Sequence, residues 1–256
     1  MSSWSVVFGV SARQLRRMLK SPPLWLPALL FPLLLFAAFA GGLSALGRSP
    51  RFHYPNYTTF QFVYVLLQAA AASGMLTGGA IADDFETGFA RRMMLASPTR
   101  WPLAVGYVLA AILRTVVVYV VLFAVGLIAG MKVAGSPVQI AAVVALALLF
   151  NAVVALFTAG FAFRTRSLQA APLSQLPVLV LMFLVPVFTT RQLLAHWVQA
   201  IADWNPITAV VEAARGLMVG DPVSVGLAFG VLGAFLAALV VWVGFCLRAA
   251  ETAGGR

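Results

Sequence analysis

Long uninterrupted apolar runs are the feature that most limits how this chain can fold. A helix needs about 20 apolar residues to cross the hydrocarbon core of a bilayer. Six stretches approach or exceed that length, and short polar segments separate them. They cover residues 24–46, 60–82, 103–130, 138–163, 173–189 and 223–247. The sequence therefore predicts an all-α membrane protein with six transmembrane helices.

The composition agrees with a bilayer environment and argues against several kinds of site. Charged residues make up 9% of the 256 and hydrophobic residues 62%, whereas roughly 25% of the residues of soluble domains are charged. The single cysteine, Cys246, excludes a disulfide framework, and His53 and His196 lie far apart. A net charge of +10 is explained by membrane topology rather than by nucleic acid. We expect no metal site, no cofactor bound by this chain and no nucleic-acid partner.

The distribution of Lys and Arg predicts the orientation, because basic residues concentrate in cytoplasmic segments. Six spans place both termini on one side, and the segments on that side hold 11 basic residues. The other side holds 5 and Arg114 falls inside the third span, which accounts for all 17. We therefore expect a multi-pass plasma-membrane protein with both termini in the cytoplasm. All basic residues except Lys20 and Lys132 are arginine, which is typical of GC-rich bacterial coding sequences.

Residues 1–22 are predicted to form an amphipathic helix in the membrane interface. One face carries apolar and small residues at steps of three or four: Trp4, Phe8, Ser11, Leu15 and Met18. The nearly opposite face carries Arg13, Arg16, Arg17 and Lys20. A basic helix with a Trp-bearing apolar strip suits the surface of anionic lipid. A simple topology anchor is the alternative interpretation.

A short, densely charged segment separates the second and third spans. Residues 83–96 have helical periodicity, with Phe85, Phe89 and Met93 on one ridge. Three acids crowd the predicted first turn, where carboxylates favour the positive end of the helix dipole, and Pro98 is expected to end the helix. An exposed apolar ridge on a charged helix usually marks a binding surface. We predict that residues 83–100 dock a soluble partner; a solvated loop that sets topology is the simpler alternative.

The segment 190–221, before the last span, is predicted to form a helical hairpin on the external side. Residues 190–204 have a one-sided apolar pattern that includes Trp197 and Trp204. Asn205 and Pro206 are favoured at the start of a second helix, which Gly220 is expected to end. Neither helix is long enough to cross a bilayer, so the hairpin is expected to be re-entrant or interfacial.

Three charged residues near the membrane need an explanation. Arg114 lies about 11 residues into the third span, close to the bilayer middle at 1.5 Å per residue. A charge there must face protein or water, and a structural role is favoured over contact with an anionic lipid or drug. Glu212 and Arg215 lie three residues apart and are expected to pair, either as a rim salt bridge or as part of a gate.

The chain has no recognisable energy source of its own. A phosphate-binding loop requires Gly-Lys-Ser/Thr at its end, but Lys20 follows Leu19 and Lys132 follows Met131. The predicted spans hold no acidic residue, which disfavours an ion-coupled carrier. Such a carrier would depend on Glu212, so Glu212→Gln would stop it and would largely spare an ATP-driven exporter. No catalytic constellation supports a membrane enzyme.

Two motifs resemble a known family. Asp84-x-Glu86-x-Gly88-x-x-x-Arg92, with Pro98 and Arg100 after it, resembles the cytoplasmic loop of type-2 ATP-binding-cassette (ABC) export permeases. The segment 205–220 is similar to the Asn-Pro-x-Thr…Arg-x-Leu-x-x-Gly motif of the daunorubicin-resistance-like branch, which handles drugs, lipids and polysaccharides. Many relatives open the loop with acid-Arg-acid, whereas this chain has Asp-Asp-Phe-Glu. The order of elements also matches, so the resemblance covers residues 1–256 as one permease domain.

The resemblance implies a non-hydrolytic permease whose segment 83–100 is a coupling helix that docks on a separate ATPase subunit. ATP and Mg would bind to that subunit, which would be present in two copies beside a permease dimer. The docking candidates are Asp84, Phe85, Glu86, Gly88, Phe89, Arg92, Met93, Pro98 and Arg100. The hairpin would form part of an external gate, and the gate or translocation candidates are Arg114, Asn205, Pro206, Glu212 and Arg215. Three Gly-x-x-x-Gly pairs permit close helix contact: Gly74/Gly78, Gly126/Gly130 and Gly226/Gly230.

Overall fold

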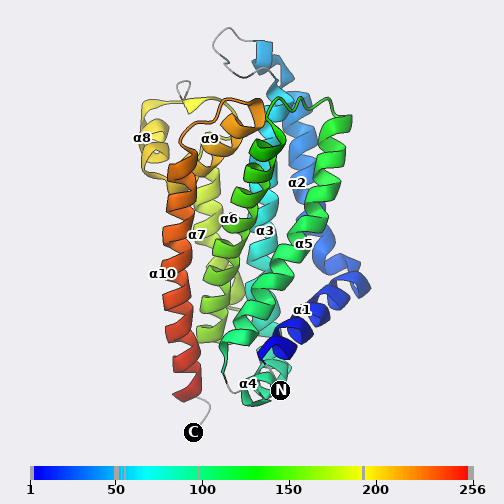
Figure 1. Ribbon diagram of the computed structural model, residues 1–256, viewed down its shortest axis with the longest axis vertical. Coiled ribbons are helices and arrows are strands. Elements are labelled where there is room, and N and C mark those ends of the chain that lie inside the picture. Colours follow the sequence, from blue (N-terminus) through cyan, green and yellow to red (C-terminus); the bar gives the residue numbers. More distant parts are fainter. Residues whose placement is uncertain are drawn as a thin grey trace.

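The computed structural model describes residues 3–48, 52, 54, 56–96, 99–191 and 194–252. The regular elements in these ranges are all helical, as the sequence predicts. They are α1 (Ser3–Lys20), α2 (Pro22–Gly42), the short 3-10 helix η1 (Ser44–Arg48), α3 (Tyr57–Glu86), α4 (Phe89–Ala96), α5 (Trp101–Ile128), α6 (Pro137–Thr165), α7 (Ala171–Phe183), α8 (His196–Trp204), α9 (Pro206–Val219) and α10 (Val225–Thr252). Figure 1 shows the long helices side by side along the long axis of the molecule.

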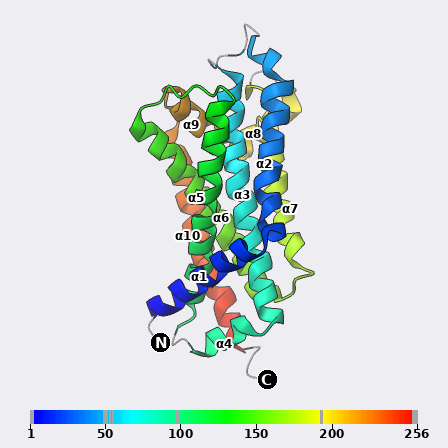
Figure 2. The same cartoon turned by 90° about the vertical axis from the view of Figure 1, so that its right-hand side faces the viewer.

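The two ends of this bundle carry different short elements. α1, α4 and the last turns of α10 lie at one end, which we call the terminal end (Figures 1 and 2). η1, α8 and α9 lie at the opposite end. A helix of 28 residues, the length of α5 and of α10, extends about 42 Å at 1.5 Å per residue. The long helices therefore connect the two ends.

Within the described ranges, four helices are long and apolar enough to cross a membrane, namely α3, α5, α6 and α10. α2 and α7 contribute the shorter apolar stretches Leu29–Gly42 and Ala171–Phe183. The 13 residues of α7 extend only about 20 Å, which is less than the ~30 Å hydrocarbon core. The chain is a multi-pass membrane protein, and the count of six spans remains a prediction.

The predicted fifth span, 173–189, is wrong at its end, because α7 stops at Phe183. Pro186 has no N–H to donate and disfavours the helical conformation at the residue before it. The chain therefore continues from Leu184 in a non-helical conformation.

Small residues bring α3 and α6 together at the centre of the bundle. A Cβ at Gly74 would lie 2.8 Å from the Val154 Cβ, and one at Gly78 would lie 2.9 Å from the Thr158 Cβ. The Thr158 hydroxyl donates to the Gly74 carbonyl oxygen at 3.1 Å. The Gly74/Gly78 pair is thus used inside the chain, since it lets two helices of one bundle approach closely.

α1 has three faces where the sequence predicts two. The face packed on the bundle carries six buried residues: Val6, Val7, Val10, Ser11, Gln14 and Met18. Trp4 and Phe8 remain 69% and 62% exposed on a second face, and Arg16 is exposed on a third. Two residues predicted for the lipid face, Ser11 and Met18, therefore face protein. The Ser11 hydroxyl donates to the Gly106 carbonyl oxygen of α5 at 2.9 Å.

The predicted hairpin forms at the opposite end, with a later start than expected. Its first helix, α8, begins at His196 instead of residue 190, and residue 193 lies outside the described residues. The Asn205 side chain caps α9 by accepting from the Ile207 N–H, and Pro206 occupies the first turn, as predicted. α9 ends at Gly220, whose φ of 87° is left-handed. Trp204 on α8 is 90% exposed.

Candidate functional site

The segment predicted to be one helix over 83–96 is divided in two. α3 continues to Glu86, and a turn at Gly88, with φ of 76°, starts the separate helix α4. Asp83, Asp84 and Glu86 therefore lie at the C-terminal end of α3, where the helix dipole disfavours carboxylates. The prediction that they begin a helix is wrong, and other groups of the protein must compensate their charge.

Asp84 is the centre of a buried polar cluster that joins three helices. Its carboxylate is fully buried and accepts from Arg13 Nη1 at 2.6 Å on both oxygens. Gln14 Nε2 donates to it at 2.8 Å, and the Tyr107 hydroxyl donates at 2.5 Å. Because these partners come from α1 and α5, Asp84 fastens both helices to the end of α3. Buried carboxylates persist only with such partners.

Neighbouring contacts extend this cluster to α4. Arg17 pairs with Asp83 at 2.6 Å, and the Arg13 guanidinium lies 3.8 Å from the centre of the Phe89 ring. Arg13 thus contacts both Asp84 and the first residue of α4. We call Arg13, Gln14, Arg17, Asp83, Asp84 and Tyr107 the Asp84 cluster.

The connection between α6 and α7 holds the other side of the α3–α4 turn. Glu86 accepts from the Leu168 backbone N–H at 2.8 Å. The Phe85 ring packs edge-on against Phe163 of α6, with centroids 6.1 Å apart, and Arg166 lies over the Phe85 ring. These contacts fix the position of α4 from a second direction.

α4 itself buries one face and exposes the other. Ala90 and Met94 are buried against the bundle. Arg91, Arg92 and Leu95 are exposed, Leu95 by 86%. We call Arg91, Arg92 and Leu95, with the half-exposed Phe89 and Met93, the α4 surface. Leu95 is not among the docking residues predicted from the sequence, although its spacing from Arg91 and Arg92 places it on their face.

The predicted docking residues are therefore divided by the fold. Phe89, Arg92 and Met93 lie on the α4 surface, while Glu86 and Gly88 lie at the turn before it. Asp84 and Phe85 are 0% and 4% exposed, so they face the interior of the protein, and their contact with a partner stays a prediction. They hold α4 in place. Arg100 precedes α5 as its N-cap residue, and Pro98 lies outside the described residues.

The gate candidates at the opposite end are arranged differently from the prediction. Arg215 is buried and donates to the carbonyl oxygens of Phe60, Pro186 and Val187 at 3.2, 2.8 and 3.4 Å. Its guanidinium also lies 3.4 Å from the centre of the Phe60 ring. Arg215 therefore joins α9 to α3 and to the chain after α7, because a guanidinium can serve several acceptors.

Glu212 pairs with Arg191 at 3.8 Å, and within the described ranges it forms no ion pair with Arg215. The predicted Glu212–Arg215 pair is therefore wrong. Arg191 also binds Asp203 of α8. Burial raises the pKa of the Glu212 carboxyl above its ordinary value, and the neighbouring Arg191 opposes that rise.

Asn205 joins the hairpin to α7 in addition to capping α9. Its side-chain amide donates to the Leu181 carbonyl oxygen at 2.7 Å. Arg114 lies far from this hairpin, on the terminal half of α5, and donates to Ser73 of α3. The predicted gate and translocation residues do not form one cluster.

The described residues contain no group of three His, Cys, Asp or Glu side chains placed to hold a metal ion. The one cysteine, Cys246 of α10, is buried in an apolar cluster that also includes residues of α3, α5 and α6. The expectation that the chain binds no metal or cofactor stays a prediction.

Comparison with known proteins gives one family. A family model described as "ABC-2 type transporter" matches residues 6–219. The comparison with curated proteins finds no match. The matched range runs from α1 to the end of α9 and so includes the Asp84 cluster, α4 and the hairpin. The family's membrane domain is a non-catalytic permease component, in keeping with the apolar helices of this chain. The chain therefore belongs to the ABC-2 type transporter family.

Proposed function

We propose that this chain is the permease subunit of an ATP-driven exporter, and that the α4 surface docks a separate cytoplasmic ATPase subunit. One observation supports the proposal most strongly: α4 is a short helix that packs on the bundle with one face and exposes the other. Its exposed side combines two arginines with an 86% exposed leucine. Arg is enriched among the residues that supply binding energy at protein interfaces, and exposed apolar side chains beside charged ones mark a binding surface.

The contacts that hold α4 on the bundle would allow a movement of α4 to be transmitted to other helices. The Asp84 cluster joins α4 to α1, α3 and α5, and Glu86 joins the turn to the chain after α6. A movement of the docked subunit would therefore reach several long helices at once. The two exposed arginines predict an acidic rim on the partner surface, since charge complementarity guides such contacts.

The proposal needs a separate ATPase because the chain has no phosphate-binding loop. It places the terminal end of the bundle in the cytoplasm of a bacterial cell, as the Lys and Arg distribution predicts. It also includes a second copy of the chain, two ATPase subunits and an amphipathic substrate of the drug, lipid or polysaccharide class. These features come from the resemblance to the daunorubicin-resistance-like branch. The second copy could pack on α10, because a Cβ at Gly226 or Gly230 would face open space and small residues let helices approach closely.

Replacing Leu95 with Asp is expected to weaken the complex with the ATPase subunit at least ten-fold. A charge would replace an exposed apolar contact of the kind that costs about 2 kcal/mol or more when lost. The measurement is the Mg-ATP hydrolysis that co-purifies with the tagged chain from native membranes in mild detergent. Phe89→Asp is expected to act in the same direction, but it also removes the contact with Arg13.

The matched control is Ile128→Asp at the opposite end of α5, because Ile128 is 87% exposed. That variant should retain the ATPase subunit at the level of the unmodified chain. Equal retention by Leu95→Asp, in protein that elutes as a folded species, would refute docking at α4.

A further inference from the structure

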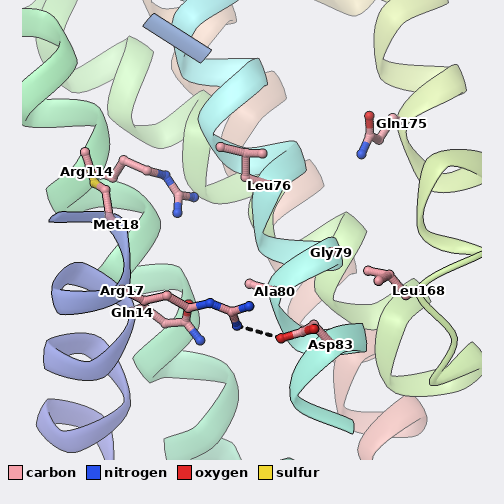
Figure 3. Close-up of a pocket in the computed structure, with 10 residues that line it drawn as sticks. All are labelled: Gln14, Arg17, Met18, Leu76, Gly79, Ala80, Asp83, Arg114, Leu168 and Gln175. Carbon is pink, nitrogen blue, oxygen red and sulfur yellow. Dashed lines mark hydrogen bonds and ion pairs between the residues drawn. The ribbon is translucent and has the colours of Figure 1, made fainter. Parts of the chain in front are cut away.

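One stripe of α3 is left partly uncovered near the terminal end. Leu76, Gly79, Ala80 and Asp83 are half-buried, whereas most of the surrounding residues of α3 are buried. Their spacing of three or four puts them on one helix face. They form a wall of a cavity of about 260 Å³, with α1 on one side and the chain from Leu168 to Gln175 on the other (Figure 3).

Arg114 points from α5 into this cavity, and its guanidinium is incompletely paired. The residue is 9% exposed. Its Nε donates to the Ser73 hydroxyl at 3.0 Å, and its Nη2 donates to the Ser73 carbonyl oxygen at 2.5 Å. A guanidinium has five N–H donors, and the described residues supply no acid within ion-pair distance of this one. Donors and positive charge therefore remain available on the cavity side.

Arg215 is the other buried arginine of the described residues, and its guanidinium has more partners. Three carbonyl oxygens and the Phe60 ring surround its guanidinium. Among the described residues, Arg114 has acceptors on Ser73 alone, and no aromatic ring lies over its guanidinium, which faces the cavity. A charged group buried in a membrane protein without a full set of partners is a candidate for ligand binding.

The other charges at the cavity leave it positive. Arg17 also lines it, and its charge is matched by Asp83 at 2.6 Å (Figure 3). Gln14 donates to Asp84, which Arg13 compensates. One positive charge, that of Arg114, is therefore left without a carboxylate among the described residues. A planar guanidinium is well suited to bind a phosphate group.

We propose that this cavity binds the phosphate group of an anionic amphiphile on Arg114, and that a phospholipid of the adjoining leaflet supplies it. The remaining wall is largely apolar, with Met18, Leu76, Ala80 and Leu168, and would accept the first carbons of the lipid tails. Arg114 lies 13 residues beyond Trp101, about 20 Å along α5, so the bound phosphate would lie below the headgroup level, inside the cavity that Arg17 and Asp83 also line. The proposal is independent of the ATPase partner, because every group it uses belongs to this chain.

The test is a titration of the delipidated, purified chain in detergent, with bound ligand counted by native mass spectrometry. The probes are short-chain phosphatidylglycerol, inorganic phosphate and diacylglycerol, which lacks the phosphate. Phosphatidylglycerol should bind saturably, and diacylglycerol should not compete with it. Arg114→Gln should weaken phosphatidylglycerol binding about ten-fold or more, as expected for a lost charge-assisted hydrogen bond.

A second variant keeps the arginine and closes the cavity. Gly79 lines the cavity, and a Cβ there would meet no atom within 4 Å, so Gly79→Leu should fold and occupy the space. It should weaken phosphatidylglycerol binding to a similar degree, and it decides the question if Arg114→Gln fails to fold. The control, Arg16→Gln, removes an exposed positive charge from α1 outside the cavity and should bind as the unmodified chain does.

Loss of phosphatidylglycerol binding in both cavity variants, with the control unaffected, supports the lipid site. Displacement of the lipid by inorganic phosphate at similar concentration supports the phosphate site with a soluble source. Unchanged binding in Gly79→Leu, or an equal loss in Arg16→Gln, would overturn the proposal, since binding would then reflect general attraction to positive charge.

Discussion

Replacing Asp84 with Ala is expected to destabilise the protein by about 3 kcal/mol, the range found when one member of a buried ion pair is removed. The substitution leaves the Tyr107 hydroxyl and the Gln14 amide without their acceptor in a fully buried position. The Arg13 side chain is 35% exposed and can turn toward water. The loss in free energy of unfolding should therefore stay below the upper end of that range. α1 should detach first, because it supplies two of the three side chains that donate hydrogen bonds to Asp84.

Thermal unfolding in detergent measures the loss of stability, and thiol labelling localises it. Cys246 is the single cysteine and is buried in the same apolar cluster as Phe85, Ala90 and Tyr107, so opening of that cluster should speed its reaction with a maleimide. The neighbouring variant Asp83→Ala is the matched control. Asp83 is partly exposed and pairs with Arg17, so its loss should cost less than about 1 kcal/mol. Equal effects of the two variants would contradict the central role given to Asp84.

Replacing Arg215 with Leu is expected to destabilise the opposite end by about 3 kcal/mol or more, because buried acceptors lose their donor and a cavity remains. The carbonyl oxygens of Phe60, Pro186 and Val187 belong to two parts of the chain, α3 and the segment after α7, and Arg215 is their common donor. Arg215→Lys should recover only part of the loss. An ammonium keeps the charge but lacks the planar fork that reaches separated acceptors.

The variant Glu212→Gln tests whether Arg215 is held by the carbonyl oxygens or by the predicted ion pair with Glu212 within α9. Glu212 lies 3.8 Å from Arg191, and both side chains are partly exposed, so its neutralisation should cost less than about 1 kcal/mol. The check is again thermal unfolding of the two variants side by side. A cost for Glu212→Gln as large as that of Arg215→Leu would mean that the carboxylate, and not the carbonyl oxygens, holds Arg215.

The long helices can be predicted from the sequence, because the length and periodicity of an apolar run are local properties. The sequence also predicts the short helices α1 and α9, whereas α4 is predicted only as part of a longer helix over 83–96. The Asn205 cap is confirmed, because cap and first-turn preferences depend on adjacent residues. The ends of α7 and α8 were misplaced. Apolar residues before and after Pro186 continue the pattern of a span, although the backbone does not remain helical there.

The roles of charged residues were harder to predict, because their partners are distant in sequence. Asp84 and Arg13 are separated by 71 positions, so a local pattern could only interpret the acid as the start of a helix or as a surface contact. Arg215 and Phe60 are separated by 155, and the nearer Glu212 was the obvious candidate. The position of Leu95 on the exposed face of α4 could be predicted from the local pattern, since Leu95 follows Arg91 by about one helical turn.

The most direct measurement of the central claim is photo-crosslinking from α4 in native membranes. A photoreactive amino acid at position 95 is compared with one at position 128, because both side chains are almost fully exposed at opposite ends of the bundle. Position 95 is expected to capture a protein that binds and hydrolyses Mg-ATP, whereas position 128 is expected to capture none. Failure to capture an ATP-hydrolysing protein at position 95, or equal capture at both positions, would contradict the central claim.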